Sequence, residues 1–160
     1  LLNARIAPAL VRGFSCGIHY DAAANSGVDV FDWRLCADTD APTTGWPASG
    51  GGNRILWKDE HVQGFEPGGP GTGVVATGGY FYLAAYTPDV MGVTAHPATG
   101  RATLLDGVGH EIPIPTAGPS PFGTLVFSAA GTQPGYVPCA AAVPVGTTTW
   151  GGIKAMFGPK

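Results

Sequence analysis

The chain has 160 residues, of which 44% are hydrophobic and only 12% charged, and its formal net charge is −3. This length predicts one domain with a substantial core, and the plentiful hydrophobic residues exclude a disordered chain. Lys and Arg are not clustered as in a nucleic-acid-binding protein, and no apolar run approaches the roughly 18 residues that span a bilayer.

The first predicted element is an extended N-terminal segment over residues 1–14, "LLNARIAPALVRGF". Leu2, Ala4 and Ile6 alternate with polar residues as they would in a strand. Pro8 confines such a strand to a sheet edge or to a break. We therefore expect a segment that can act as a donor strand, adding to the exposed sheet edge of another copy.

Residues 15–145 are predicted to form one antiparallel β-sandwich, either Ig-like or of the jelly-roll or Greek-key type. Helical periodicity is nearly absent, whereas strand-like runs recur at roughly ten-residue spacing between turns rich in Gly and Pro. Apart from the three runs described next, the predicted strands are "VMGVTA", "ATLLD", "EIPI", "TLVFSA" and "GYVPCAAAV".

Three runs carry the strongest strand patterns. In "VDVFDWRLC", strict alternation places Phe31, Trp33 and Leu35 on one face. In "RILWK", the same rule brings Ile55 and Trp57 together. The run "YFYLAAYT" is apolar or aromatic on both faces and is therefore predicted to be a central strand.

The three cysteines, Cys16, Cys36 and Cys139, show no Cys-x-x-Cys spacing. The chain begins without Met, which a removed signal peptide explains most simply, so we expect an exported protein in the extracellular space or on the cell surface. In that compartment one disulfide and one remaining thiol are expected, with three possible pairings. Three buried, reduced cysteines are the alternative.

No recognisable constellation for catalysis or metal binding is present. The four histidines are scattered, no Gly-x-Ser-x-Gly motif surrounds Ser49, and Asp38 and Asp40 lack the closing Glu of a calcium loop. We therefore expect no enzyme activity and no cofactor. An exported hydrolase with an unfamiliar site stays a third hypothesis, with the candidate groups Asp29, Asp32, Asp59, Glu60 and His61.

A planar row of exposed aromatic side chains is the usual surface of a sugar-binding module. Trp33 and Trp57 lie on alternating strands and are predicted to be core residues. Trp46 lies in a loop rich in Pro and Gly, and Trp150 lies in the tail, so these two are expected to be exposed. Trp46 is therefore the predicted contact for a polysaccharide.

The last predicted element is the C-terminal tail, residues 146–160, which forms one short helical turn, an edge strand or an extended arm. The stretches "GIHYD", "FDWRLCADTDAPTTGWPASGGGNRILW", "GGYFYLAAYTPDVMGVTAH", "PGYVPC" and "TTTWGGIKAMF" resemble a group of uncharacterised secreted proteins of environmental bacteria. Many of these close with Thr-Thr-Trp-Gly-x-Ile/Val-Lys. The resemblance implies an exported bacterial β-protein whose ending is a sorting or anchoring signal, recognised at Thr148, Trp150, Gly151, Ile153 and Lys154. Because this chain continues to "GPK", a structural use of the tail is also indicated.

The leading functional hypothesis is an extracellular structural protein: a self-assembling sandwich subunit of a surface filament or layer, joined by its terminal strands. All eleven acidic residues lie between Asp21 and Glu111, and the flanking segments carry only basic charges, which favours head-to-tail contact between copies. The alternative is a secreted carbohydrate-binding or adhesion module. The predicted assembly residues are Leu2, Ala4, Ile6, Leu10, Trp150, Ile153 and Phe157.

Overall fold

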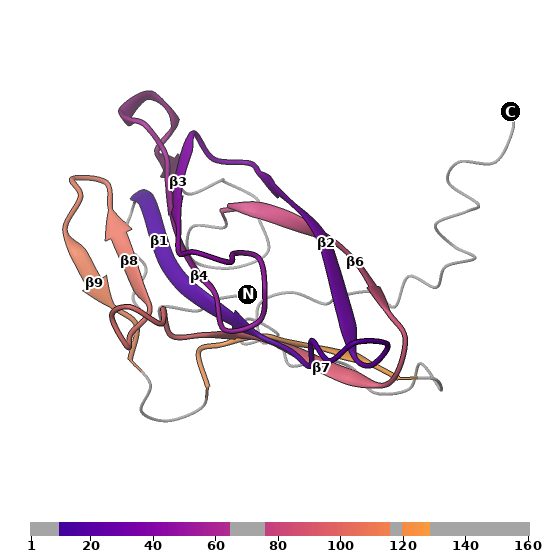
Figure 1. Cartoon of the computed structure of the whole chain (residues 1–160). Coiled ribbons are helices and arrows are strands. Elements are labelled where there is room, and N and C mark those ends of the chain that lie inside the picture. Colours follow the sequence, from indigo (N-terminus) through magenta and orange to yellow (C-terminus); the bar gives the residue numbers. More distant parts are fainter. Residues whose placement is uncertain (1–9, 65–75, 116–119, 129–160) are drawn as a thin grey trace, which may run out of the picture.

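The computed structural model describes residues 10–64, 76–115 and 120–128 (Figure 1). In these ranges the chain forms antiparallel strands and one short 3-10 helix, which confirms the predicted all-β, sandwich-like fold. The elements are β1 (Leu10–His19), β2 (Val28–Leu35), β3 (Thr39–Pro42), β4 (Gly52–Leu56), η1 (Asp59–His61), β5 (Gln63–Gly64), β6 (Gly79–Ala85), β7 (Asp89–Thr94), β8 (Thr103–Asp106), β9 (Glu111–Pro113) and β10 (Thr124–Phe127).

The larger sheet is built around β1, in the order β10-β7-β1-β4-β3. One edge of β1 pairs with β4 and β5, and the other edge pairs with β8 along its first half and with β7 along its second half. The strand β9 extends the β8 branch. A β-bulge between Val11 and Gly13 accompanies the change of register along β8.

The predicted boundary between an N-terminal segment (residues 1–14) and the sandwich does not match the strands of the structure. The boundary after residue 14 falls inside β1, and residues 10–14 pair with β4, β5 and β8 of the same chain. Pro8 precedes the described residues, so its restriction does not reach the strand that begins at Leu10. These residues form the centre of a sheet rather than a free edge.

The second sheet consists of β2 and β6, and no other described strand pairs with either. Figure 1 shows this pair as a separate layer beside β1 and β4. The prediction that "YFYLAAYT" is a central strand is therefore wrong for the described part of the chain. The aromatic residues on the two faces of β6 differ in their surroundings: Phe81 packs against the core, whereas Tyr80 and Tyr82 are exposed.

The core lies between the two sheets in two clusters of buried side chains, each of which contacts residues of β2. Burial of a single Val or Ile side chain stabilises the fold by about 1.5–3 kcal/mol. The prediction that Ile55 and Trp57 share a buried face is confirmed. The buried members are Ile18, Tyr20, Val28 and Met91 in the first cluster and Val11, Ile55 and Trp57 in the second.

The described helical structure is limited to η1, and no helix in the described ranges is long and apolar enough to cross a membrane. The predicted strand "GYVPCAAAV" and the C-terminal tail lie outside the described residues.

Candidate ligand-binding face

The outer side of the β2–β6 sheet carries four exposed aromatic rings. The exposed fractions are 57% for Phe31, 58% for Tyr80, 68% for Tyr82 and 56% for Tyr86. We call these four residues the aromatic face. Monomeric domains seldom gather large apolar groups at the surface without a function, so this face is the main candidate site of the described chain.

Strand alternation and one β-bulge place these rings together. Residues directly opposite in an antiparallel pair share a face, and Arg34 stands opposite Tyr80 while Asp32 stands opposite Tyr82. Phe31 is the extra residue at the bulge between Val30 and Asp32. Its ring therefore lies on the outer side, 5.9 Å from the ring of Tyr82 between centroids.

This arrangement corrects the alternation expected for "VDVFDWRLC". The sequence pattern placed Phe31 on the same face as Trp33 and Leu35, whereas the bulge moves Phe31 to the opposite face. Trp33 and Leu35 keep the predicted orientation and pack against the buried cluster of Ile55 and Trp57. One inserted residue therefore transfers an aromatic ring from the core to the candidate site.

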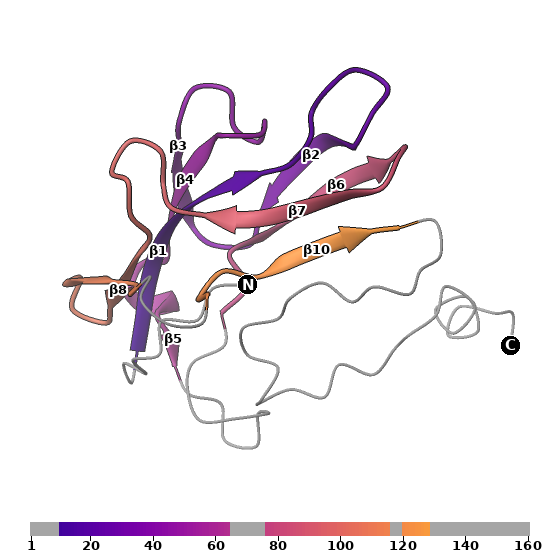
Figure 2. The ribbon, with the colours of Figure 1, turned by 90° about the horizontal axis from the view of Figure 1, so that it is seen from below.

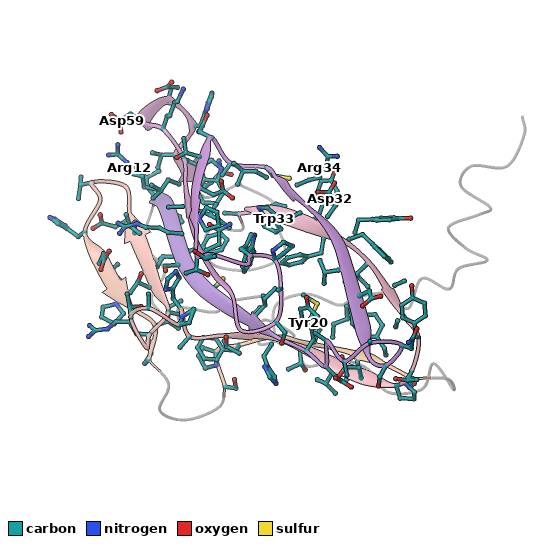
Figure 3. All side chains as sticks on the ribbon, in the orientation of Figure 1. Arg12, Tyr20, Asp32, Trp33, Arg34 and Asp59 are labelled. Carbon is teal, nitrogen blue, oxygen red and sulfur yellow. The ribbon has the colours of Figure 1, made fainter. Side chains whose placement is uncertain are left out.

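A short ion pair lies beside the rings. Arg34 Nε donates to Asp32 Oδ2 at 2.7 Å, and Asp32 Oδ1 accepts the backbone N–H of Trp33 at 2.9 Å. Figure 3 shows Asp32 and Arg34 pointing away from the core, while Trp33 points from β2 toward β1 and β4. Because the guanidinium has five N–H donors, the ion pair leaves donors of Arg34 available to a ligand.

A layer of aromatic rings supports the site from the inner side. The ring of Trp33 lies 4.7 Å from Phe81 and 5.4 Å from Trp46, and Trp46 lies 5.6 Å from Phe81. Trp33 Nε1 donates to Asp40 Oδ2 at 3.2 Å, and the buried Asn53 donates to the same oxygen at 2.9 Å. These contacts hold β2 against the larger sheet and so fix the position of the aromatic face.

Trp46 does not take the position that its sequence context predicted. Although it lies in a Pro- and Gly-rich loop, its side chain is half-buried and packs against Trp33 and Phe81. Its Nε1 atom is buried and has no hydrogen-bond partner among the described residues. Trp46 therefore supports the sheet from behind, and the exposed rings come from β2, β6 and the residue Tyr86 instead.

The loop hydroxyl considered for nucleophilic chemistry has a structural role. Ser49 Oγ donates to the Tyr20 carbonyl at 2.6 Å and accepts the Tyr20 backbone N–H at 2.9 Å. His19 Nδ1 lies 3.4 Å from the same oxygen. Because the hydroxyl proton is already directed to a carbonyl, this contact does not arrange His19 as the base for Ser49.

The groups of the hydrolase hypothesis lie on two separate elements. Asp29 and Asp32 belong to β2, whereas residues 59–61 form η1. Asp59 binds Arg12 at 2.6 Å. In the described ranges no three His, Cys, Asp or Glu side chains gather as they would around a metal ion.

Two surface carboxylates each form a pair with a histidine. Asp38 accepts the Lys58 backbone N–H at 2.9 Å and lies 2.7 Å from His61 Nδ1. These hydrogen bonds lower the pKa of Asp38, the backbone bond most strongly. Asp106 has a lowered pKa for the same reason, because it accepts the backbone N–H of His110 and lies beside that imidazole. The first pair joins the β2–β3 connection to η1, the second closes the turn between β8 and β9, and neither includes a residue of the aromatic face.

Of the three possible cysteine pairings, the described residues contain both partners of one, Cys16–Cys36, and that disulfide is not formed. Cys16 and Cys36 are both free, so the described chain contains no disulfide. Cys16 is buried in β1, and burial raises the pKa of its thiol to about 12. Cys36 is exposed just after β2. Cys139 lies outside the described residues.

Most of the predicted assembly residues lie outside the described ranges. Leu10 is described: it begins β1, stands opposite Gly64 and is 48% exposed. The positions of the resembled C-terminal ending also lie outside these ranges. The other assembly residues that are not described are Leu2, Ala4, Ile6, Trp150, Ile153 and Phe157.

No family model, no curated protein and no solved structure matches this chain. The functional assignment therefore depends on the residues and geometry given above.

Proposed function

We propose that this chain is a carbohydrate-binding module that holds a polysaccharide on its aromatic face. The observation that carries the proposal is the set of four exposed rings on one side of β2 and β6. Sugar rings present C–H groups that pack on aromatic rings, and aromatic side chains supply much of the contact energy at binding surfaces. The Tyr hydroxyls and Arg34 supply hydrogen bonds for sugar hydroxyls.

This proposal reverses the order of the two leading sequence hypotheses. The sequence favoured a structural subunit because its terminal segments have the pattern of strands that could pair with another copy. Those segments are largely outside the described residues. The aromatic face is described in full. The proposal keeps the expected exported location, where cell-wall and surface polysaccharides occur, and it assigns no reaction and no cofactor.

The direct test is calorimetric titration of the chain with a panel of oligosaccharides, comparing wild type with Tyr82→Ala. Tyr82 is the most exposed of the four rings, and removing one stacking ring should weaken binding about tenfold. Val108→Ala is the control, since Val108 is 73% exposed but lies in the turn between β8 and β9. Equal affinities for both variants would remove the aromatic face from the binding site.

A second candidate function is self-assembly by strand addition, and the edge strand β10 favours it. In the described chain β10 pairs only with β7, and Figure 2 shows it at the rim of the sheet. Leu125 stands opposite Met91, so it shares the core-facing side. Met91 is 7% exposed, whereas Leu125 is 49% exposed. This edge has the apolar positions that an added strand would cover.

In this second proposal the added strand comes from a terminal segment of another copy. Residues 10–14 are already used in β1, so the N-terminal donor would be residues 1–9, and the C-terminal donor would be residues 146–160. Size-exclusion chromatography with light scattering tests the proposal with Leu125→Lys, because a charge on an edge strand opposes strand addition. Assembly should be lost in this variant. Unchanged assembly would exclude the β10 edge.

A further inference from the structure

We propose that the ligand of the aromatic face is a linear, uncharged polysaccharide that lies along β6. This inference depends on the proposed function and specifies its substrate class. Two observations carry it: the tyrosines follow one strand, and the one basic side chain of β2 and β6 is outnumbered by carboxylates on the same side of the sheet.

The direction follows from the positions of the tyrosines. Tyr80, Tyr82 and Tyr86 stand at even positions of the same strand and its continuation, and they span about 20 Å at roughly 3.3 Å per residue. Tyr86 is still held to the β2 side, because its backbone N–H donates to the Gly27 carbonyl at 2.9 Å. Phe31, on the neighbouring strand β2, adds a second ring beside the row at Tyr82. A row of this shape matches an extended chain better than a small molecule.

The charge preference follows from the residues around the row. Arg34 is the only basic residue of β2 and β6, and its Nε is paired with Asp32. Asp29 stands opposite Ala84 and shares the outer side of the sheet. The row therefore runs past two carboxylates, Asp29 and Asp32, and one guanidinium that Asp32 already pairs. The excess negative charge on this side of the sheet disfavours a polyanion.

The test compares oligosaccharides of equal length and different charge. The full chain is titrated at low ionic strength with the neutral cellohexaose and laminarihexaose and with the anionic hexagalacturonate. Shorter members of each neutral series are titrated in parallel. We expect a neutral hexasaccharide to bind at least about tenfold more tightly than the anion and than its own trisaccharide, because more rings are covered.

One variant tests the charge argument separately. Asp32→Asn removes the partner of the Arg34 guanidinium, so it should raise the affinity for hexagalacturonate by about threefold or more and leave neutral binding nearly unchanged. Retained far-ultraviolet circular dichroism confirms the fold. Arg34→Gln in the same background should cancel the gain, since it removes the released cation.

The outcomes distinguish this inference from the proposed function. Binding of hexagalacturonate as tight as that of the neutral chains, or affinity independent of length, overturns the inference and leaves carbohydrate binding in place. Absence of binding by every oligosaccharide overturns both. A dimer that Tyr82→Ala dissociates would assign the aromatic face to self-association and would also overturn both.

Discussion

At the β-bulge of β2, Phe31 has no residue of β6 directly opposite, whereas Phe81 faces the core between Trp33 and Trp46. We predict that Phe31→Ala changes the free energy of unfolding by no more than about 0.5 kcal/mol. Phe81→Ala should lower it by about 3 kcal/mol, because it leaves a gap among packed rings. Urea denaturation measures both, and equal losses would mean that Phe31 is a core residue.

The hydrogen bonds that Asp38 forms with the Lys58 backbone N–H and with His61 give the stability of the fold a defined dependence on pH. A pKa lowered below the ordinary value of 3.8 means that the folded state prefers the ionised carboxylate. The stabilisation is therefore present above about pH 3.8 and is lost as the pH falls through the folded-state pKa. We predict that Asp38→Asn lowers the melting temperature at neutral pH and flattens its decline in acid.

Melting temperatures of wild type and Asp38→Asn from neutral pH down to about pH 2 make this comparison. The two curves should converge in acid, where the wild-type carboxyl is protonated and its hydrogen bonds weaken. Parallel curves over the whole range would show that the Asp38 contacts do not form in solution.

At the scale of elements, β1 requires glycine where neighbouring strands approach it. A Cβ at Gly13 would lie 2.5 Å from the Ile55 carbonyl oxygen and 2.7 Å from a methyl carbon of Leu56. We predict that Gly13→Ala lowers the free energy of unfolding by about 1–3 kcal/mol. Gly92→Ala is the matched control, since its Cβ would meet only a Thr124 methyl carbon at 3.6 Å. Similar urea midpoints for the two variants would contradict the pairing of β1 with β4.

The sequence predicted several strands correctly because their alternation and their turns are local. The strands β4, β7, β8, β9 and β10 all appear where runs with Gly- and Pro-rich boundaries were expected. The central place of β1 was missed, because Pro8 indicated an edge strand and the predicted segment ended at residue 14, inside β1. The strand β3 was missed because Asp38 and Asp40 read as turn residues, and Asp40 instead binds Trp33 and Asn53.

The candidate site was only partly predictable, for the same physical reason. The alternation of Tyr80 and Tyr82 with Phe81 was visible in the sequence, but which side meets solvent depends on what packs against it. In the structure Phe81 is partly buried against the core, and both tyrosines are exposed. The position of Phe31 depends on a bulge, and a bulge is set by the register with β6 rather than by local composition.

At the scale of the whole molecule, the aromatic face and the edge strand β10 belong to different sheets. The aromatic face lies on the outer side of the two-stranded sheet, whereas β10 forms an edge of the larger sheet. Because they use different elements, one chain can bind a polysaccharide and still add a strand from a neighbour. The two proposals therefore do not exclude each other.

The central claim is that the aromatic face binds a polysaccharide, and backbone amide NMR with added cellohexaose or laminarihexaose tests it most directly. The account predicts concentration-dependent shifts that cluster at Phe31, Tyr80, Tyr82 and Tyr86, with the β8–β9 turn unchanged. Shifts confined to other strands, or no shifts with either neutral hexasaccharide, would contradict it.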